Sequence, residues 1–378
     1  MTGSGESSGM LKPGEVIKPY VADKEVPSLV KKTFGLDVIS FTKFNAYDDL
    51  NFHIKVKETS NNEYITSPSS DGYVFKIINS KDSKLTSLLE GQNNFMLHLN
   101  SKNYCCPLPL KSLSGKYLAE VELPSDPNAN AVQKHAVKLL TFIPGQTLAS
   151  VPLTPQLCSE AGAYLANMHH DLEGFQDEAI SARRFIWMMS ETPQVRAFVH
   201  AITNSENRDL VTSALNAWES QVLPVIGNLP KGIVHGDFNE QNILVKPSPD
   251  TRHEPHPTYT VLGCIDFGDV SSSCYVFDLS VLVMSLLTVD NNDAVAASCI
   301  AGYNATRPLS HLEWQVLYEC VCGRLCTSLT IGAYSLSQDP GNTYLLTSAR
   351  LGWGALRRLR DAGKTATLAA WGYHGEER

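Results

Sequence analysis

Residues 234–245, with the sequence VHGDFNEQNILV, decide the fold, because a polar segment of fixed spacing stands between two apolar runs. The segment has the form H-x-D-x-x-x-x-N. Phosphoryl transfer needs a carboxylate that orients the acceptor hydroxyl, and an oxygen ligand for the metal that neutralises the phosphates. Asp237 suits the first, catalytic role and Asn242 the second, and their spacing lets one rigid loop position both groups. The alternative is an Asx-rich turn between two strands.

A second acidic motif follows downstream. Residues 263–268, GCIDFG, form an apolar run that ends in D-F-G, and Asp266 comes 29 residues after Asp237. We expect Asp266 to bind the metal that bridges the phosphates, while Gly268 lets the chain turn away. A lone D-F-G arises by chance, but at this distance after H-x-D-x-x-x-x-N it is specific. The two motifs together predict a kinase that uses Mg²⁺.

The partners for the nucleotide are expected upstream, where strand signals crowd the chain. Lys76 stands in the β-rich run 73–78, and Glu90 follows on a predicted helix. An ion pair between them would present the lysine to the α- and β-phosphates. The alternatives are a solvated edge-strand lysine, or Glu58 or Glu63 as the acidic partner.

The order of predicted elements divides the chain. Strands are expected at residues 52–57, 73–78, 117–123 and 137–143, with one helix from about residue 83. Helices are expected further on, at residues 156–171, 192–203, 209–222, 275–288, 312–334 and 342–361. Strands before and helices after a hinge near 143–145 indicate an α+β fold. We therefore expect a flexible segment over 1–22, a small antiparallel-sheet N-lobe over 23–142 that grips the nucleotide phosphates, and a larger, mostly helical C-lobe over 143–378.

Composition restricts the class of function and the compartment. The chain has 378 residues, and 31 Lys and Arg against 39 Asp and Glu give a net charge of −8, which argues against a nucleic-acid binder. The longest apolar run, residues 279–289, is shorter than the roughly 18 residues of a membrane span. Residues 1–13 lack the apolar centre of a signal peptide, and nine irregularly spaced cysteines do not form a disulfide framework. We expect a soluble protein of a reducing compartment that has no membrane partner.

The motifs resemble those of a known superfamily. His-Gly-Asp at 235–237 with Asn242 and Asp266, the connector 139–145 and the stretch 161–169, AGAYLANMH, resemble the aminoglycoside phosphotransferase and choline kinase superfamily. The resemblance implies a bilobal, protein-kinase-like fold and phosphorylation of hydroxyl groups on small molecules. Glycine in place of the arginine of H-R-D favours this branch over the protein kinases.

Further stretches at 47–53, 185–187, 275–277 and 332–335 make nearly the whole chain similar to the hydroxylysine kinase family. This resemblance implies GTP-dependent phosphorylation of 5-hydroxy-L-lysine at its side-chain hydroxyl, in the cytoplasm. Composition and spacing alone reach only a small-molecule kinase with GTP or ATP as donor. A kinase of another small hydroxylated amine (an aminoglycoside, amino alcohol or homoserine-like acceptor) stays open, and so does a pseudokinase that acts as a binding module.

The nucleotide site departs from the protein-kinase pattern in one respect. Between positions 35 and 72 the sequence contains no glycine, so the G-x-G-x-x-G loop is absent. We expect the turn at 47–51 to replace it, with Asn51 near the phosphates. The base is expected to meet backbone groups around Leu140 and Phe142.

The remaining candidate residues concern substrate binding and structural support. Asp269, directly after D-F-G, is the candidate for a substrate ammonium group, and Arg324 the candidate for a substrate carboxylate. The alternative for Arg324 is a helix-surface ion pair. We expect His235 to hold the backbone and Asp278 to support the catalytic loop or cap a helix. His169 and His170 are expected to interact with the C-terminal end of their helix.

Overall fold

The computed structural model describes residues 17–46, 48–124, 126, 132–338 and 349–375. The chain divides into two compact units, with the division in the sequence between Pro144 and Gly145. Most of the predicted N-terminal segment, residue Tyr47 of the predicted turn and residues 342–348 of the last predicted helix lie outside the described residues. The functions that we assigned to the two regions remain predictions.

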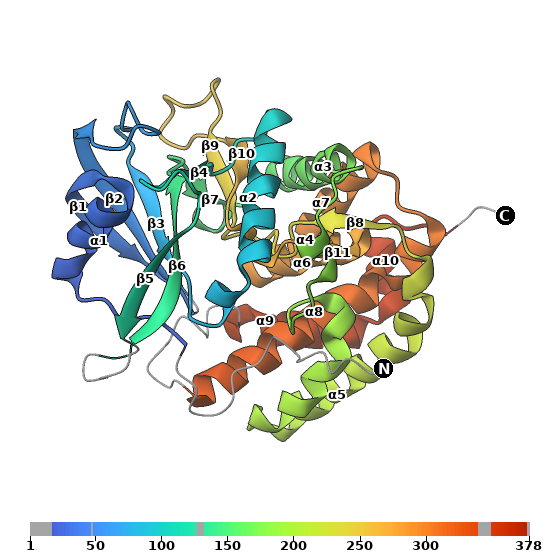
Figure 1. Cartoon of the computed structure of the whole chain (residues 1–378). Helices are drawn as coiled ribbons and strands as arrows, with labels where there is room; N and C mark the ends of the chain where they lie inside the picture. Colours follow the sequence, from blue (N-terminus) through green and yellow to red (C-terminus); the bar gives the residue numbers. More distant parts are fainter. Residues whose placement is uncertain (1–16, 47, 125, 127–131, 339–348, 376–378) are drawn as a thin grey trace. The chain divides into compact units, whose positions relative to one another are not determined.

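The first unit is built on an antiparallel sheet (Figure 1). Its strands are β1 (Leu36–Phe44), β2 (Leu50–Ser60), β3 (Tyr73–Ile77), β4 (Pro109–Leu110), β5 (Ala119–Pro124) and β6 (Val132–Thr141). Their order is β1-β2-β3-β6-β4, with β5 also paired to β6. β2 buries every second residue over most of its length, as its period of two predicts. The predicted strands at 117–123 and 137–143 are displaced by a few residues, and β1 was not predicted.

The two faces of this sheet have different neighbours. Helix α1 (Val26–Phe34) packs on one face, where Phe34 meets Phe75 edge-to-face with ring centroids 6.2 Å apart. Because side chains alternate along a strand, Lys76 and its cross-strand neighbour Asn51 lie on the opposite face. Burial of the apolar face stabilises the sheet, at roughly 1.5–3 kcal/mol for each large side chain.

Two boundaries in this unit differ from the prediction. Helix α2 (Thr86–Ser101) starts later than residue 83, because a 3₁₀ turn, Asp82–Lys84, precedes it. Residues 17–22, the described part of the predicted flexible segment, are packed. Ile17 and Val21 are buried, and the backbone N–H of Tyr20 donates to the carbonyl of Pro124.

The second unit is mostly helical (Figure 1). Its described α-helices are α3 (Pro155–Asp171), α4 (Glu178–Ala182), α5 (Ser205–Gln221), α6 (Tyr275–Val289), α7 (Asp293–Thr306), α8 (His311–Gln338), α9 (Ala349–Ala362) and α10 (Lys364–Ala370). The helix predicted at 192–203 is instead a long 3₁₀ helix, η4 (Met189–Ala201), with Pro193 inside it. Proline cannot donate the backbone hydrogen bond of an α-helix interior, which explains the difference.

Close backbone contacts and a central helix organise this unit. α6 is buried from Tyr275 to Leu287, so it forms the centre against which other helices pack. α3 and α7 touch through glycines, because a Cβ on Gly162 would lie 2.0 Å from the carbonyl oxygen of Cys299. The same close approach recurs at Gly302 of α7.

Short strands carry the functional loops of the second unit. They are β7 (Gln146–Thr147), β8 (Lys231–Val234), β9 (Ile243–Pro247), β10 (Tyr259–Cys264) and β11 (Ser271–Cys274). β9 lies between β10 and β7, and β8 pairs with β11. The H-x-D-x-x-x-x-N loop therefore connects β8 to β9, and the D-F-G motif follows β10.

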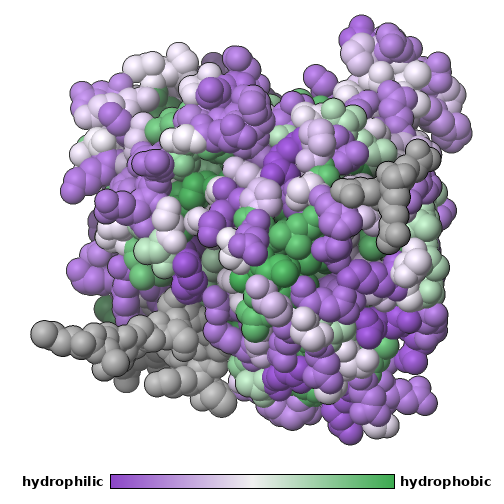
Figure 2. Space-filling view, turned by 90° about the vertical axis from the view of Figure 1, so that its right-hand side faces the viewer, coloured by the Kyte–Doolittle hydropathy of each residue, from purple (hydrophilic) through white to green (hydrophobic). Residues whose placement is uncertain are grey.

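The predicted α+β class, a small antiparallel sheet followed by a larger helical part, is confirmed. Figure 2 shows one face of the molecule, on which hydrophilic side chains dominate and apolar patches are scattered among them. Among the described residues, no helix combines the length and the apolar character that crossing a membrane requires.

Candidate active site

The loop between β8 and β9 brings the two predicted catalytic-loop residues together. The side-chain oxygen of Asn239 accepts the backbone N–H groups of Gln241 and Asn242, at 2.9 and 3.1 Å, and so closes the turn. The amide nitrogen of Asn242 donates to the carboxylate Oδ2 of Asp237 at 3.0 Å and to the Asp237 carbonyl at 2.9 Å. This leaves the amide oxygen of Asn242 as the atom that can bind a metal.

Arg324 of α8 holds the other oxygen of the catalytic carboxylate. Its Nη2 donates to Asp237 Oδ1 at 3.0 Å, and its Nη1 donates to the carbonyl of Trp187 at 2.8 Å. The guanidinium also lies over the Trp187 ring, 5.3 Å from the centroid. The side chain of Arg324 is 5 % exposed, so it is not in the helix-surface ion pair that was the alternative. We had expected a substrate carboxylate as its partner, and its partner here is the carboxylate of Asp237.

The backbone of the catalytic loop is held by Asp278 of α6 and by His235. Asp278 accepts the N–H groups of His235 and Gly236 at 3.2 and 2.9 Å. His235 is buried, and its Nε2 lies 3.0 Å from the carbonyl oxygen of Ile265, which precedes the D-F-G motif. Gly236 has a φ of +82°, and a Cβ there would lie 2.3 Å from the carbonyl oxygen of Asp269. Only glycine fits this position, which explains why it replaces the arginine of H-R-D.

Asp278 is itself the end of a buried polar chain. Its Oδ2 contacts Nε2 of His169 at 3.1 Å, and Nδ1 of His169 contacts the hydroxyl of Tyr303 at 2.8 Å. The Tyr303 hydroxyl meets Arg307 at 3.4 Å, and Arg307 pairs with Glu313 at 2.9 Å. The expected helix-end role of His169 is therefore wrong. This side chain is fully buried, and burial lowers its pKa, so the neutral ring links the catalytic loop to α7.

The D-F-G aspartate sits at a backbone position that side chains rarely adopt. Asp266 has a φ of +62°, and its Oδ1 accepts the N–H of Gly268 at 3.2 Å. Such outliers persist where the surrounding structure holds them, and they concentrate at functional sites. Asp266 lies near enough to Asp237 to raise the pKa of that carboxyl.

Electrostatics indicate which kind of group the site would bind. Burial is the main cause that raises the pKa of Asp237, nearby Asp266 and Asp278 add to it, and Arg324 opposes it. A divalent cation would relieve this concentration of negative charge. The amide oxygen of Asn242 and the carboxylate of Asp266 are ligands that Mg²⁺ prefers, and Mg²⁺ is commonly held by one or two protein oxygens plus phosphates. These residues therefore fit the expected metal.

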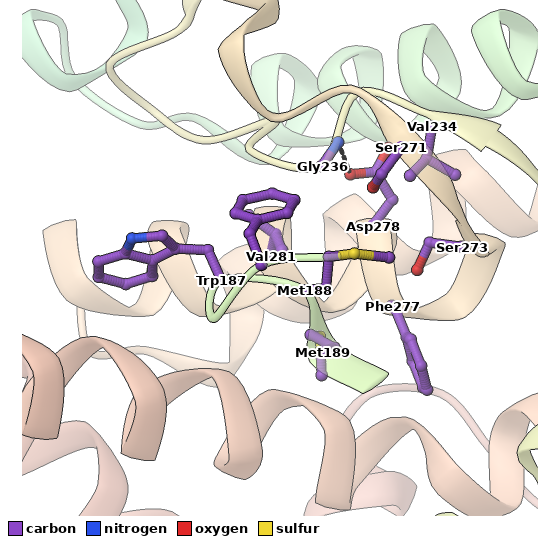
Figure 3. A pocket seen from close by; sticks show the side chains of 11 residues that line it. Trp187, Met188, Met189, Val234, Gly236, Ser271, Ser273, Phe277, Asp278 and Val281 are labelled. Carbon is purple, nitrogen blue, oxygen red and sulfur yellow. Dashed lines mark hydrogen bonds between the residues drawn. The ribbon is translucent and has the colours of Figure 1, made fainter. Parts of the chain in front are cut away.

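A pocket lies beside the catalytic loop (Figure 3). It is a shallow pocket that is partly open to solvent, and Gly236 and Asp278 form part of its wall. Phe185, Trp187 and Met188, which come from the segment before η4, supply much of its apolar lining. The pocket adjoins Asp237 through the neighbouring Gly236.

In the first unit, Lys76 of β3 is held by an acid that we did not predict. Its Nζ lies 3.1 Å from Oδ2 of Asp49, in the turn between β1 and β2. The other oxygen of Asp49 accepts the backbone N–H and the side-chain amide of Asn79, at 2.9 and 3.1 Å. Glu90 of α2, the predicted partner, accepts a hydrogen bond from Asn93 at 3.1 Å. The predicted ion pair between Lys76 and Glu90 thus stays a prediction, and Asp49 is a second candidate for the role.

The remaining predicted nucleotide residues lie on the face of the sheet that carries Lys76. Asn51 pairs with Lys76 across the strands, and its buried Oδ1 has no hydrogen-bond partner in the described residues. Leu140 of β6 aligns with β3 on the same face. Phe142 stacks on His53, with ring centroids 3.8 Å apart. His53 was not among the predicted site residues. The only indication in the sequence was that His53 lies in the stretch 47–53, on which the family resemblance partly rests.

Comparison with known proteins assigns the family. The model of a phosphotransferase enzyme family matches residues 56–314, a span that includes the catalytic loop and the D-F-G motif. The chain belongs to this family. It is therefore a phosphotransferase with a hydroxyl group as acceptor, as the motifs predicted.

More specific relatives share almost the whole chain. A hydroxylysine kinase from Xenopus laevis is 32% identical, with 94% of both chains covered. A hydroxylysine kinase from Bos taurus is 29% identical over 98% of this chain and 96% of the relative. The predicted resemblance to hydroxylysine kinases is confirmed. Among solved structures, an amicoumacin kinase has a TM-score of 0.64 at 14% identity, with 90% of this chain and 94% of that chain covered, which confirms the predicted kinase-like fold.

Proposed function

We propose that the protein transfers the γ-phosphate of GTP or ATP, with GTP the expected donor, to the side-chain hydroxyl of 5-hydroxy-L-lysine. One observation carries the chemistry: the Asp237 carboxylate is fixed between Asn242 and Arg324 on a loop whose backbone Asp278 holds. The similarity to hydroxylysine kinases over nearly the full chain supports this acceptor.

In this proposal Asp237 orients the acceptor hydroxyl and takes its proton. The hydroxyl oxygen forms a bond to the γ-phosphorus, the bond from that phosphorus to the β–γ bridging oxygen breaks, and the nucleoside diphosphate leaves. Because the transition state is loose, position matters more than basicity. Arg324 keeps Asp237 in one orientation. Mg²⁺, held by Asn242 and Asp266, would neutralise charge on the phosphates.

For the donor, we assign Lys76 to the phosphates and Asn51 beside it, with backbone groups at Leu140 and Phe142 near the base. Asp49 supports Lys76 through the contact at 3.1 Å, in the role first assigned to Glu90. No glycine-rich loop is available, so the turn that holds Asp49 takes its place.

For the acceptor, we assign Asp269 to an ammonium group. A Cβ on Gly236 would lie 3.3 Å from Cβ of Asp269, so Asp269 adjoins the loop that carries Asp237. Hydroxylysine has an ammonium group on the carbon next to its hydroxyl and a second one at its α-carbon. The cytoplasm is the compartment we propose, because no disulfide joins any of the nine cysteines, all of which lie in the described residues.

The test is release of nucleoside diphosphate by the purified protein with Mg²⁺ and GTP or ATP, with 5-hydroxy-L-lysine and L-lysine compared. We expect release only with the hydroxylated compound, and faster release from GTP. Release with neither acceptor would discard hydroxylysine and lead to a panel of other hydroxylated amines. A thermal shift with Mg²⁺ and nucleotide, but turnover on no acceptor, would instead indicate a pseudokinase.

A further inference from the structure

Arg183, directly after α4 (Glu178–Ala182), is held in one position by contacts on two sides. Its Nη1 donates a short hydrogen bond to the carbonyl of Gly268 and lies 3.5 Å from the carbonyl of Val270. The flat guanidinium stacks on the Phe185 ring, 3.9 Å from the centroid. An arginine fixed by two carbonyls and one ring is pre-organised, so little further freedom is lost when it binds an anion.

These contacts do not use all the N–H donors of Arg183. Its Nη2 lies 3.9 Å from Oδ1 of Asp269, which is close enough for attraction but too long for a hydrogen bond. Within the described residues, Nε and Nη2 of Arg183 donate to no oxygen. Neither atom is fully buried. The unused N–H groups are therefore accessible.

Asp269, the facing acid, is also incompletely satisfied. Its side chain is 25 % exposed, and it faces Arg183 at the same long distance. Burial raises the pKa of Asp269 to about 6, and the charge of Arg183 opposes that rise. An additional cation at this carboxylate would be stabilised.

Arg324, by contrast, already uses its terminal nitrogens in other hydrogen bonds. Both of its terminal nitrogens donate to protein oxygens, one of them on Asp237, and its Nε is fully buried. Arg183 is therefore better placed than Arg324 to receive a carboxylate from an acceptor.

We propose that Arg183 and Asp269 form a recognition site for the head group of an α-amino acid, with the carboxylate on Arg183 and the α-ammonium on Asp269. The proposal rests on the proposed function and deepens it, because it makes the acceptor class an amino acid and not a simple amino alcohol or diamine. One positive and one negative side chain face each other without a hydrogen bond, which suits a ligand whose opposite charges are joined through one carbon. Phe185 then acts as a support for the arginine and as part of the pocket wall.

The competing explanation is that Arg183 only ties α4 to the segment after the D-F-G motif. A structural role of that kind would affect every acceptor equally. The two explanations therefore separate when the acceptor's carboxylate is removed.

The experiment compares 5-hydroxy-L-lysine with 1,5-diaminopentan-2-ol, which lacks only the carboxylate, in the wild type and in Arg183→Met. We expect the substitution to lower kcat/KM for hydroxylysine by about 10- to 100-fold, mainly through KM, since hydrogen bonds to a charged group are lost. The same substitution should leave kcat/KM for the diamino alcohol within about twofold. An equal loss for both acceptors would overturn the assignment.

Two further variants sharpen the result. Arg183→Lys keeps the charge but loses the planar fork, so it should recover part of the preference for hydroxylysine. Arg208→Met is the matched control, because Arg208 also donates to two backbone carbonyls, those of Ile202 and Thr203, at 2.9 and 3.4 Å. It should change the preference for neither acceptor.

Failure of the proposed function has a separate signature. If the wild type phosphorylates neither compound, calorimetric binding of L-lysine and cadaverine still tests the site, because these two also differ only in the carboxylate. Tighter binding of L-lysine that disappears in Arg183→Met would support the head-group site without the kinase reaction. Equal binding of both compounds by the wild type would overturn it.

Discussion

Each unit fixes one functional charge with an ion pair, but the two pairs differ in how burial is divided between the partners. In the first unit the side chains of Lys76 and Asp49 are 19 and 18 % exposed. In the second unit Arg324 is only 5 % exposed, although its partner Asp237 is 29 % exposed. Arg324 is the most deeply buried of the four side chains, and loss of one partner from a buried pair costs about 3–5 kcal/mol. We therefore expect the first pair to affect nucleotide affinity and the second to affect both stability and turnover.

The largest effect is expected at the acidic member of the buried pair. Asp237→Asn keeps the shape of the side chain but removes the acceptor of the substrate proton, so turnover should fall by about 10²- to 10⁴-fold. Nucleotide affinity, measured by calorimetry, should stay within about threefold. Turnover close to the wild-type value would mean that Asp237 is not the catalytic residue.

The basic member of the same pair should show its effect in stability as well. Arg324→Met leaves Asp237 without its cation, and the free energy of unfolding in urea should decrease by about 3 kcal/mol. Turnover should fall at least about tenfold, because the carboxylate loses one of the contacts that orient it. Arg324→Lys, which retains the charge, is the matched variant and should lose less stability. Loss of nucleotide affinity alone, with turnover and stability retained, would contradict this interpretation.

Asp48, the neighbour of Asp49 in the ion pair of the first unit, allows a test by pH. Burial, with the charges of Asp49 and Asp82, raises the pKa of Asp48 to about 6. A carboxyl whose pKa is raised by folding destabilises the fold once it is charged, so stability is lost as the pH rises from about 4 to above 6. Asp48→Asn should therefore increase the free energy of unfolding by about 2 kcal/mol at pH 7.5 and hardly change it at pH 4. The exposed Asp71→Asn should change neither value.

The smallest effect is expected at the ion pair of the first unit itself. Asp49→Asn removes the carboxylate that holds Lys76, and KM for the nucleotide should rise about tenfold while kcat stays within about twofold. Glu90→Gln is the comparison, because Glu90 is the helix residue first predicted as the partner. If Glu90→Gln raises KM and Asp49→Asn does not, the predicted pair with Glu90 is the functional one.

The sequence predicted the local structure well where the arrangement depends on a short segment or a simple burial pattern. The catalytic loop needs only a short contiguous segment, in which Asn239 closes the turn and places Asp237 beside Asn242. α6 is apolar along nearly its whole length, and it is buried as that pattern indicates. β2 alternates, and its burial alternates with it.

Prediction failed where packing overrides the local pattern. β1 carries two register irregularities, between Leu36 and Val38 and between Val38 and Ser40, which displace the alternation that identifies a strand. α7 was missed because its apolar residues do not repeat with a clear helical period, and it meets α3 through small residues such as Gly302. η4 has the composition of a helix but contains Pro193, and its neighbours hold it as a 3₁₀ helix.

The sequence by itself determined the class of chemistry, because H-x-D-x-x-x-x-N and D-F-G each need only neighbouring residues to place a carboxylate or a metal ligand. Only the tertiary structure decided which charges meet. Arg324 reaches Asp237 from a helix far along the chain, and Arg183 reaches the segment after D-F-G from the end of α4. The type of a side chain limits which partners it can bind. Which of these partners it meets depends on burial and distance, and both are properties of the folded chain.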